Sequence, residues 1–415
     1  MQLTLPESLL TPQLDRLFEA LSPYENRLVG GVVRDLILGV ESADVDICTT
    51  ATPEQVMERL DIKQINYAPT GIEHGTITAH FNSGVYEITT ARKDVATDGR
   101  HAEVAYTTDF EEDAKRRDFT FNALYMDLDG NVTDYFGGID DLQNGVVRFI
   151  GNPDARIQED YLRIMRFFRF YARYGTTQPD EDTLRALVRH GPKLTTLSAE
   201  RLTKEWLSLL KLDNPLFALS MMDATGMTGH LGLTPFHTAP LEKFIQFFKK
   251  VDTTPENRWA CLQWAADDAA VMLENPHFKL SNKQRDHIQA LFDVRPVELD
   301  PDYPEYTAYW HNVQALAVRY ALDACHGTRK MEGTREQINL LLSLELPQFP
   351  VEATAVMKLG IPEGPFVGEL LDALEKWWVD NQFPGRKACL VKLDALVKDL
   401  QKREAAKPSG KSEHA

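Results

Sequence analysis

The feature of this sequence that most limits its fold is a change of pattern near residue 150. Before it, strand-like and helix-like segments alternate, whereas nearly all of the chain after Asp154 has helical periodicity and few β-branched runs. We therefore expect an α+β head, with helices and a mixed sheet of about five strands, followed by an all-α remainder. At 415 residues the chain is long enough for roughly two to four domains.

Local signals define the elements of the head. A strand ends at the pair Gly30-Gly31, and a helix follows over 32–38 until Gly39. Thr52 with Pro53 behind it predicts another helix start. The strands are expected at 27–30, 44–48, 74–81, 85–90, 123–128 and 131–136, the last four as two hairpins.

The rest of the chain is expected to be helical. The segment 155–174 has helical spacing and ends at Gly175, which predicts one long helix with a glycine at its C′ position. Further helices are expected at 199–212, 216–224, 241–251, 283–294, 368–380 and 388–403. The domains we expect are a head (1–150), a neck (151–230), a body and tail (231–404) and a disordered end (405–415).

Charge and cysteine content exclude several classes of protein. Lysine and arginine number 45 against 62 acids, and the net charge of −17 is not the balance of a general polyanion binder. A nucleic-acid partner must therefore meet a local basic patch. The four cysteines lie far apart without a Cys-x-x-Cys pair, which argues against a zinc site or a disulfide framework. The N-terminus lacks a basic leader and no apolar run approaches the ~18 residues of a membrane span, so we expect a cytoplasmic protein.

The glycine pair lies where a strand passes into a helix. Backbone N–H groups in such a turn can approach a phosphate, and the helix dipole favours the anion. Arg34, one helical turn after Gly30 and Gly31, can add a charge-assisted hydrogen bond to the same phosphate. On its own, a Gly-Gly pair also fits an ordinary tight turn.

Three acids are candidate catalytic residues. Asp44 and Asp46 point to one face of the second strand by alternation, and two neighbouring acids repel each other unless a cation lies between them. Hard oxygen ligands suit Mg²⁺, so we take these two as metal ligands. Glu87 joins them if its hairpin strand neighbours theirs. The alternatives are a solvated strand face for the pair and an exposed strand residue for Glu87.

A dense polar stretch precedes the next strand, with Arg116, Arg117, Asp118 and Asn122 close together. An arginine fork suits a triphosphate, and Asp118 and Asn122 suit either a ribose or a supporting role behind the arginines. The alternative interpretation is the end of an amphipathic helix with a capping network.

Arginines recur along the segment 156–173. Asp160 and Arg163 are three residues apart and share a helix face, where they present an acceptor beside a donor fork. Such a pair can address the Watson–Crick edge of a base, since Asp accepts from an exocyclic amine and Arg donates to a ring nitrogen or carbonyl. The alternative is an ordinary salt bridge between the two side chains.

In this order the motifs resemble the tRNA nucleotidyltransferase and poly(A) polymerase family of template-independent polymerases, most densely over 27–175. The resemblance implies that the glycine pair and Arg34 hold the triphosphate, and that Asp44 and Asp46 bind catalytic magnesium. The family's Glu-Asp-x-x-Arg motif, here Glu159-Asp160-x-x-Arg163, is an amino-acid template that reads CTP or ATP. Nucleotide-binding roles are thus implied for Gly30, Gly31, Arg34, Arg117, Asp118, Asn122, Asp160, Arg163, Arg166 and Arg169.

The resemblance assigns two further segments. Residues 98–103 look like a loop that helps to switch specificity from C to A, and 198–210 look like a helix that braces the neck. The resemblance implies that the neck (151–230) recognises the nucleotide base and that the body and tail (231–404) bind tRNA, although after about residue 230 it is only a helical pattern.

The function that the resemblance implies is addition of C, C and A to the tRNA 3′ end, with Mg²⁺ as cofactor and release of pyrophosphate. Its partners are then the tRNA acceptor arm, CTP and ATP, with no membrane and no stable protein partner evident. A poly(A) polymerase or a CC-only or A-only enzyme remains an alternative, although the loop at 98–103 favours full CCA addition. The long helical extension argues against a small-molecule nucleotidyltransferase, and the intact carboxylates argue against a non-catalytic RNA-binding scaffold.

Overall fold

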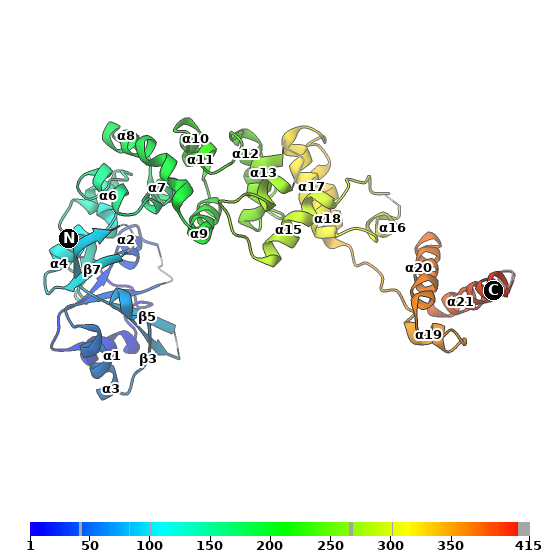
Figure 1. Ribbon diagram of the computed structural model, residues 1–415, viewed down its shortest axis with the longest axis horizontal. Coiled ribbons are helices and arrows are strands. Elements are labelled where there is room, and N and C mark those ends of the chain that lie inside the picture. Colours follow the sequence, from blue (N-terminus) through cyan, green and yellow to red (C-terminus); the bar gives the residue numbers. More distant parts are fainter. Residues whose placement is uncertain (41–43, 83, 99–100, 265–268, 301, 406–415) are drawn as a thin grey trace, which may run out of the picture. The chain divides into compact units, whose positions relative to one another are not determined.

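The structure is a computed structural model and describes residues 1–40, 44–82, 84–98, 101–264, 269–300 and 302–405 (Figure 1). The chain divides into two compact units. Unit 1 comprises Met1–Ala239, Thr254–Gln263 and Ala270–Ser281, and unit 2 comprises Pro240–Thr253, Trp264–Ala269 and Asn282–Ala415. The described strands lie in the blue and cyan part of unit 1, and the green to red part is helical (Figure 1). This confirms an α+β head before an all-α remainder, while the finer division into neck, body and tail stays a prediction.

A seven-stranded mixed sheet forms the centre of the head. Its strand order is β3-β4-β5-β2-β1-β8-β9, and neighbours are antiparallel except for β2 and β5, which are parallel. Its strands are β1 (Asn26–Val29), β2 (Asp46–Thr49), β3 (Asn66–Gly71), β4 (Thr76–Phe81), β5 (Gly84–Thr90), β8 (Leu124–Met126) and β9 (Val132–Asp134). A separate hairpin consists of β6 (Arg92–Asp98) and β7 (His101–Tyr106).

The expectation of about five strands was too low. The six strands predicted from the sequence are all in the sheet, and β3 is the additional one. Pro69 and Gly71 argue against a strand in the sequence, which is why β3 was not predicted. It is an edge strand whose register shifts between Ala68 and Gly71, and sheets tolerate a proline at such a place. The segment 98–103, expected as a loop, belongs mostly to the β6–β7 hairpin, and Gly99 and Arg100 lie outside the described residues.

Strand alternation gives the sheet two buried faces. Leu28 and Ile47 face one hydrophobic core together with α1 and α3, whereas their neighbours Val29 and Cys48 face a second core with α4. α3 begins behind the Thr52 cap, as predicted. The head helices are α1 (Pro12–Leu21), α2 (Gly31–Ile37), α3 (Pro53–Ile62), α4 (Phe110–Lys115) and α5 (Gly138–Gln143), with the short turns η1 (Ile72–His74) and η2 (Thr120–Asn122).

The helical remainder follows the predicted periodicity. In unit 1 it contains α6 (Pro153–Glu159), α7 (Leu162–Tyr174), α8 (Glu181–His190), η3 (Gly191–Thr196), α9 (Ala199–Leu210), α10 (Leu216–Ala224), α11 (Met227–His230), α13 (Pro255–Gln263) and α14 (Ala270–Leu273). α12 (Thr238–Phe247) passes into unit 2, which contains α15 (Asn282–Asp293), α16 (Pro304–Ala308), α17 (Val313–His326), α18 (Thr334–Ser343), α19 (Ala353–Met357), α20 (Pro365–Asp380) and α21 (Arg386–Ala405). The six helices expected after residue 199 coincide with α9, α10, α12, α15, α20 and α21, with ends that differ by a few residues.

The prediction of one long helix over 155–174 was wrong, because the chain breaks between α6 and α7. Asp160 is extended, with φ −156° and ψ 107°. Its carboxylate accepts a hydrogen bond from the Leu162 N–H at 3.1 Å, a local bond that competes with helix continuation. Gly175 has φ −73°, so it is not the left-handed C′ glycine that was expected. A Cβ there would lie 2.6 Å from Tyr171 Cδ2, so packing excludes a side chain.

Aromatic side chains hold α7 against the head. The rings of Phe167 and Phe170 lie 6.4 and 5.3 Å from that of Phe119, and Phe121 lies 5.5 Å from Phe170. Each such pair adds about 0.5–1.5 kcal/mol beyond the burial of its surface. Because Phe119 and Phe121 belong to the polar stretch that follows Arg117, this packing holds that stretch next to α7.

All four cysteines are free and buried. Within the ranges that the structure describes, no helix combines the length and apolar character needed to cross a lipid bilayer.

Candidate active site

The turn between β1 and α2 requires a glycine at its first position. Gly30 has φ +69°, in the left-handed region that other residues adopt at a cost. An added Cβ would lie 3.6 Å from Arg117 Nη1 at Gly30 and 3.7 Å from Arg34 Nη2 at Gly31, which are ordinary contacts. The backbone conformation, not lack of space, therefore requires glycine at position 30, and two guanidinium groups lie beside the turn.

Arg34 is buried and fixed in orientation. Its Nη1 donates to Asn122 Oδ1 at 2.8 Å, and its Nε donates to Asp35 Oδ1 at 3.1 Å. The guanidinium carbon lies 4.9 Å from the centroid of the Tyr174 ring. A guanidinium fixed in this way is suited to directed hydrogen bonds with phosphate oxygens.

Asp46 opens β2 and is the register partner of Glu87 on β5. The expectation that the Glu87 strand neighbours the Asp46 strand is therefore confirmed. Burial raises the pKa of Asp46 to about 6, with further contributions from the negative charges of Glu87 and Asp44, while Arg117 and Arg34 act in the opposite direction. A positive charge near Asp46 is therefore favourable, and Arg117 and Arg34 supply only part of it.

The strand predicted to begin at Asp44 begins at Asp46, so Asp44 lies two residues before β2. That the two carboxylates share one face stays a prediction. Among the described residues, no three His, Cys, Asp or Glu side chains are gathered closely enough to form a metal site by themselves. The carboxylates act on one another through their charge and do not form a ready-made cluster.

A buried carboxylate positions both arginines of the polar stretch. Asp113 accepts hydrogen bonds from Arg116 Nε at 2.8 Å, from Arg117 Nε and Nη2 at 3.2 Å, and from the Tyr125 hydroxyl at 2.6 Å. Although burial opposes ionisation, Arg117, Arg116 and Tyr125 together lower the pKa of Asp113 to about 2. Burial likewise opposes the charge of Arg117, but Tyr125 and Asp113 outweigh it and raise the pKa of Arg117. Sequence reasoning missed Asp113.

Asp118 joins the polar stretch to α7. Its Oδ1 accepts from Asn122 Nδ2 at 2.9 Å, and its Oδ2 accepts from Arg166 Nε at 2.7 Å. Burial acts against ionisation, but Arg166 and Asn122 lower the pKa of this carboxyl. These contacts match the supporting role expected as one of two possibilities for Asp118 and Asn122.

Asp160 and Arg163 have separate partners. Asp160 Oδ2 accepts from Arg201 Nη2 at 2.6 Å, whereas Arg163 Nη1 donates to the Arg156 carbonyl oxygen at 2.8 Å and also pairs with Glu159. Asp160 and Arg163 therefore do not form the ordinary salt bridge with each other that was considered as an alternative. Each side chain is instead fixed by partners of its own: Arg201 for Asp160, and Glu159 with the Arg156 carbonyl for Arg163.

These residues surround a cavity of about 450 Å³ in unit 1. Ten of the thirteen candidate site residues line it, namely Gly30, Gly31, Arg34, Asp46, Arg117, Asp118, Asn122, Asp160, Arg163 and Arg166. Five arginines against three aspartates leave a positive surplus in the lining. A small cavity of this kind suits an anionic ligand with a polar group to be recognised.

Three candidates lie outside this lining, and three other residues are part of it. Asp44 and Glu87 influence Asp46 through charge, and Arg169 Nε donates to Glu205 Oε2 at 2.6 Å. The residues missed are Leu162, Phe170 and Arg201. Phe170 follows Arg163 at i+7, so helical spacing could have indicated it. Arg201 is contributed by α9, a segment noted only as a brace.

Two parts of the chain match known families. Residues 26–148 match the family described as Poly A polymerase head domain. Residues 178–236 match the family described as probable RNA and SrmB-binding site of polymerase A. The first match contains the glycine turn, Asp46 and the polar stretch, and the second contains α9.

Individual proteins are similar over nearly the whole chain. The mitochondrial CCA tRNA nucleotidyltransferase 1 of Mus musculus is 36% identical over 401 residues, which cover 91% of this chain and 89% of the relative. The CCA-adding enzyme of Geobacillus kaustophilus is 35% identical over 372 residues, covering 88% of this chain and 91% of the relative. The crystal structure of the Bacillus stearothermophilus CCA-adding enzyme in complex with CTP matches with a TM-score of 0.75 at 28% identity, covering 95% of this chain and 100% of the other.

Proposed function

The chain belongs to the CCA-adding tRNA nucleotidyltransferase family, as its motifs predicted, and we propose that it adds C, C and A to the 3′ end of tRNA from CTP and ATP. The observation that carries the proposal is the cavity in unit 1. It combines a candidate base-reading pair, cations for a triphosphate and the carboxylate of Asp46 in one space. Its volume of about 450 Å³ is that of a small-ligand site.

Asp160 and Arg163 select the base. Cytosine and adenine each present an exocyclic amine beside a ring-nitrogen acceptor, so Asp160 accepts from the amine and Arg163 donates to the ring nitrogen. Uracil and guanine present a carbonyl and a ring N–H at those positions, which sets acceptor against acceptor and donor against donor. The separate partners of the two side chains support this role, because neither needs the other to be satisfied.

The triphosphate lies against the glycine turn and the arginines. Arg117 lies beside Gly30 and Arg34 beside Gly31, and each is held by hydrogen bonds that fix its guanidinium before a ligand arrives. Fixed cations lose little freedom on binding and offset the charge that develops in phosphoryl transfer. Arg166, joined to Asp118, adds a third cation to this wall.

Asp44 and Asp46 hold Mg²⁺ in this proposal, and Glu87 supports them. Their carboxylate oxygens are the donors that Mg²⁺ prefers, and the burial and neighbouring negative charges that raise the pKa of Asp46 mean that a nearby cation would stabilise its ionised form. Bound there, Mg²⁺ supplies Lewis acidity that activates the tRNA 3′-hydroxyl and offsets charge on the departing pyrophosphate. The 3′-hydroxyl loses its proton to water, its oxygen bonds to the α-phosphorus, and the bond from that phosphorus to the bridging oxygen of the pyrophosphate breaks. No covalent enzyme intermediate is needed.

The names of the relatives favour full CCA addition over poly(A) synthesis or addition of only part of the CCA end. A cytoplasmic location, and the head, neck, body and tail division, are parts of this proposal.

Addition reactions with defined tRNA ends test the proposal. Transcripts ending before the CCA, after the first C and after the second C are incubated with CTP, ATP or both, and product lengths are read on a sequencing gel. We expect three, two and one added nucleotides respectively when both substrates are present, with Asp46→Asn as the inactive control. A ladder of adenosines would point to a poly(A) polymerase. Binding of tRNA without any addition would point to an RNA-binding scaffold.

A further inference from the structure

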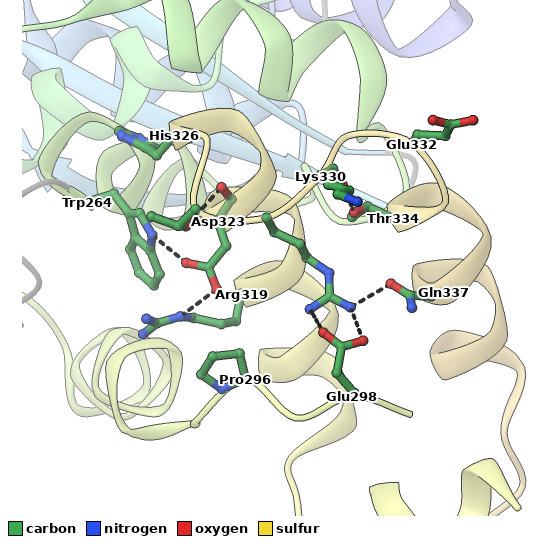
Figure 2. A pocket seen from close by; sticks show the side chains of 12 residues that line it. Trp264, Pro296, Glu298, Arg319, Asp323, His326, Lys330, Glu332, Thr334 and Gln337 are labelled. Atoms are coloured by element: carbon green, nitrogen blue, oxygen red, sulfur yellow. Dashed lines mark hydrogen bonds and ion pairs between the residues drawn. The ribbon is translucent and has the colours of Figure 1, made fainter. Parts of the chain in front are cut away.

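Unit 2 has two hollows, and their charges differ: one lies beside α17 and the start of α18, and the other lies between the end of α12 and α18. The larger has a volume of about 920 Å³, and its arginines are paired within it (Figure 2). Arg319 Nε donates to Asp323 at 3.1 Å. Arg329 donates to Glu298 at 3.3 Å and to Gln337 Oε1 at 2.6 Å. Three acids balance the three Lys and Arg side chains of this cavity, so it offers a polyanion no surplus of positive charge.

The smaller hollow, here called the basic groove, lies between the end of α12 and the start of α18. Its volume is about 270 Å³, and its lining contains Lys249, Lys250 and Arg335 without any acid. All three side chains are exposed, and within the described part of the chain none has an acid at ion-pair distance. Three like charges repel one another in the free protein, so this arrangement becomes favourable when an anion binds.

The walls of the basic groove are anchored. Phe248 and Ile338 are buried beneath it and hold the two cation-bearing segments to unit 2. Phe247 stays exposed, and the guanidinium carbon of Arg335 lies 5.8 Å from the centroid of its ring. Proteins that bind nucleic acid use surfaces of this kind, in which cations contact the phosphates and an exposed aromatic ring contacts a base or sugar.

We infer that the basic groove binds phosphates of the tRNA backbone while the 3′ end occupies the cavity of unit 1. The inference rests on the proposed function, because that function makes tRNA the substrate. In a chain with 62 acids and 45 basic residues, RNA must be met by local positive surfaces, and this groove is one. Lys249, Lys250 and Arg335 then position the substrate and take no part in the chemistry.

Binding measurements on the full chain test the inference. The variants are the double substitution Lys249→Gln with Lys250→Gln, and the single substitution Arg335→Gln. Lys330→Gln is the matched control, because Lys330 is also exposed but lines the larger, charge-balanced cavity. A labelled tRNA lacking its CCA end is titrated at several salt concentrations by fluorescence anisotropy, and CMP addition is followed in parallel. Thermal melting verifies that each variant is folded.

We expect the groove variants to raise the Kd for tRNA about tenfold, and to reduce the slope of log affinity against log salt by roughly 1 for each phosphate that the protein no longer neutralises. The KM for tRNA should rise with the Kd, whereas the KM for CTP and the kcat at saturating tRNA stay as in the wild type. Lys330→Gln should behave as the wild type.

Unchanged affinity and salt slope in the groove variants, with CMP still added to tRNA, would overturn the groove and leave the proposed function intact. An equal loss of affinity in Lys330→Gln would also overturn it, because the effect would then be general to positive charge in unit 2. Failure of the wild type to extend any tRNA would instead overturn the proposed function.

Discussion

Asp46 and Glu87 lie opposite each other on the parallel strands β2 and β5, so that two carboxylates of the head share one register position. Together with burial, this neighbour keeps the pKa of Asp46 high, at about 6. A buried carboxylate next to a second negative charge is stabilised by a cation. The pairing of β2 with β5 therefore favours the metal-assisted chemistry proposed for the cavity.

Asp46→Asn should make the protein more stable while abolishing nucleotide addition. The pKa of Asp46 rises from 3.8 to about 6 on folding, so the stability that its protonated form provides at low pH is lost as the pH rises through about 6. Above that pH the free energy of unfolding of the variant should exceed that of the wild type by up to about 3 kcal/mol, since one pKa unit is worth about 1.4 kcal/mol. Urea unfolding in metal-free buffer measures the difference.

The gain should vanish below about pH 4, where Asp46 is protonated in both folded and unfolded states. Added Mg²⁺ should stabilise the wild type above pH 6 and leave Asp46→Asn unaffected. A difference between wild type and variant that does not change with pH would contradict this electrostatic account of Asp46.

Gly30→Ala and Gly31→Ala form a matched pair at the turn. Alanine at position 30 must adopt φ +69° and ψ −115°, which costs on the order of 1–3 kcal/mol, whereas position 31 is the first residue of α2 and has room for a methyl group. Thermal unfolding should therefore show a loss for Gly30→Ala and little change, or a small gain, for Gly31→Ala. Equal losses would mean that space rather than conformation fixes the glycine at position 30.

Asp113→Asn should affect both stability and nucleotide binding. The fully buried carboxylate pairs with Arg116 and Arg117, and breaking a buried pair typically costs about 3–5 kcal/mol. With Arg117 released, the KM for CTP should rise. Tyr125→Phe removes the hydrogen bond donated to the same carboxylate and the one accepted from Arg117 Nε, and should cost about 2 kcal/mol. Denaturant unfolding of the two variants, with CTP kinetics, compares them.

The contribution of Asp113 should persist at unusually low pH. Its pKa falls from 3.8 to about 2 on folding, so its stabilisation is fully present above pH 3.8 and is lost as the pH falls through about 2. A stability loss in Asp113→Asn no greater than that in Tyr125→Phe would show that Asp113 does not hold the arginines.

Much of the site could be predicted because its motifs are local. The glycine turn, Arg34 and the stretch from Arg117 to Asn122 each have a short-range pattern with a chemical reason, and the cavity is lined by all of them. Asp113 and Arg201 could not be found in this way. Asp113 gains its role from contacts with Tyr125 on β8, and Arg201 gains its role by meeting Asp160 from a helix 41 residues away.

The errors in the fold have the same origin. Helical periodicity continues through Asp160, but one hydrogen bond from the Leu162 N–H to its carboxylate favours a break there. Pro69 argues against a strand in the sequence, and only its place at the sheet edge, beside a shift in register, makes a strand possible. Asp44 was assigned to β2 by alternation, but the strand begins two residues later.

Nucleotide selection by Asp160→Ala and Arg163→Ala tests the central claim most directly. The measurement is kcat/KM for CTP, ATP, UTP and GTP with a tRNA that lacks its CCA end. A site built on hydrogen bonds discriminates by about 10⁴ or more, because the wrong base leaves buried polar groups unpaired. We predict that the preference for CTP over UTP falls by at least about a hundredfold in Asp160→Ala, through weaker use of CTP and better use of UTP. Wild-type discrimination among all four nucleotides in both variants would contradict base reading by this pair.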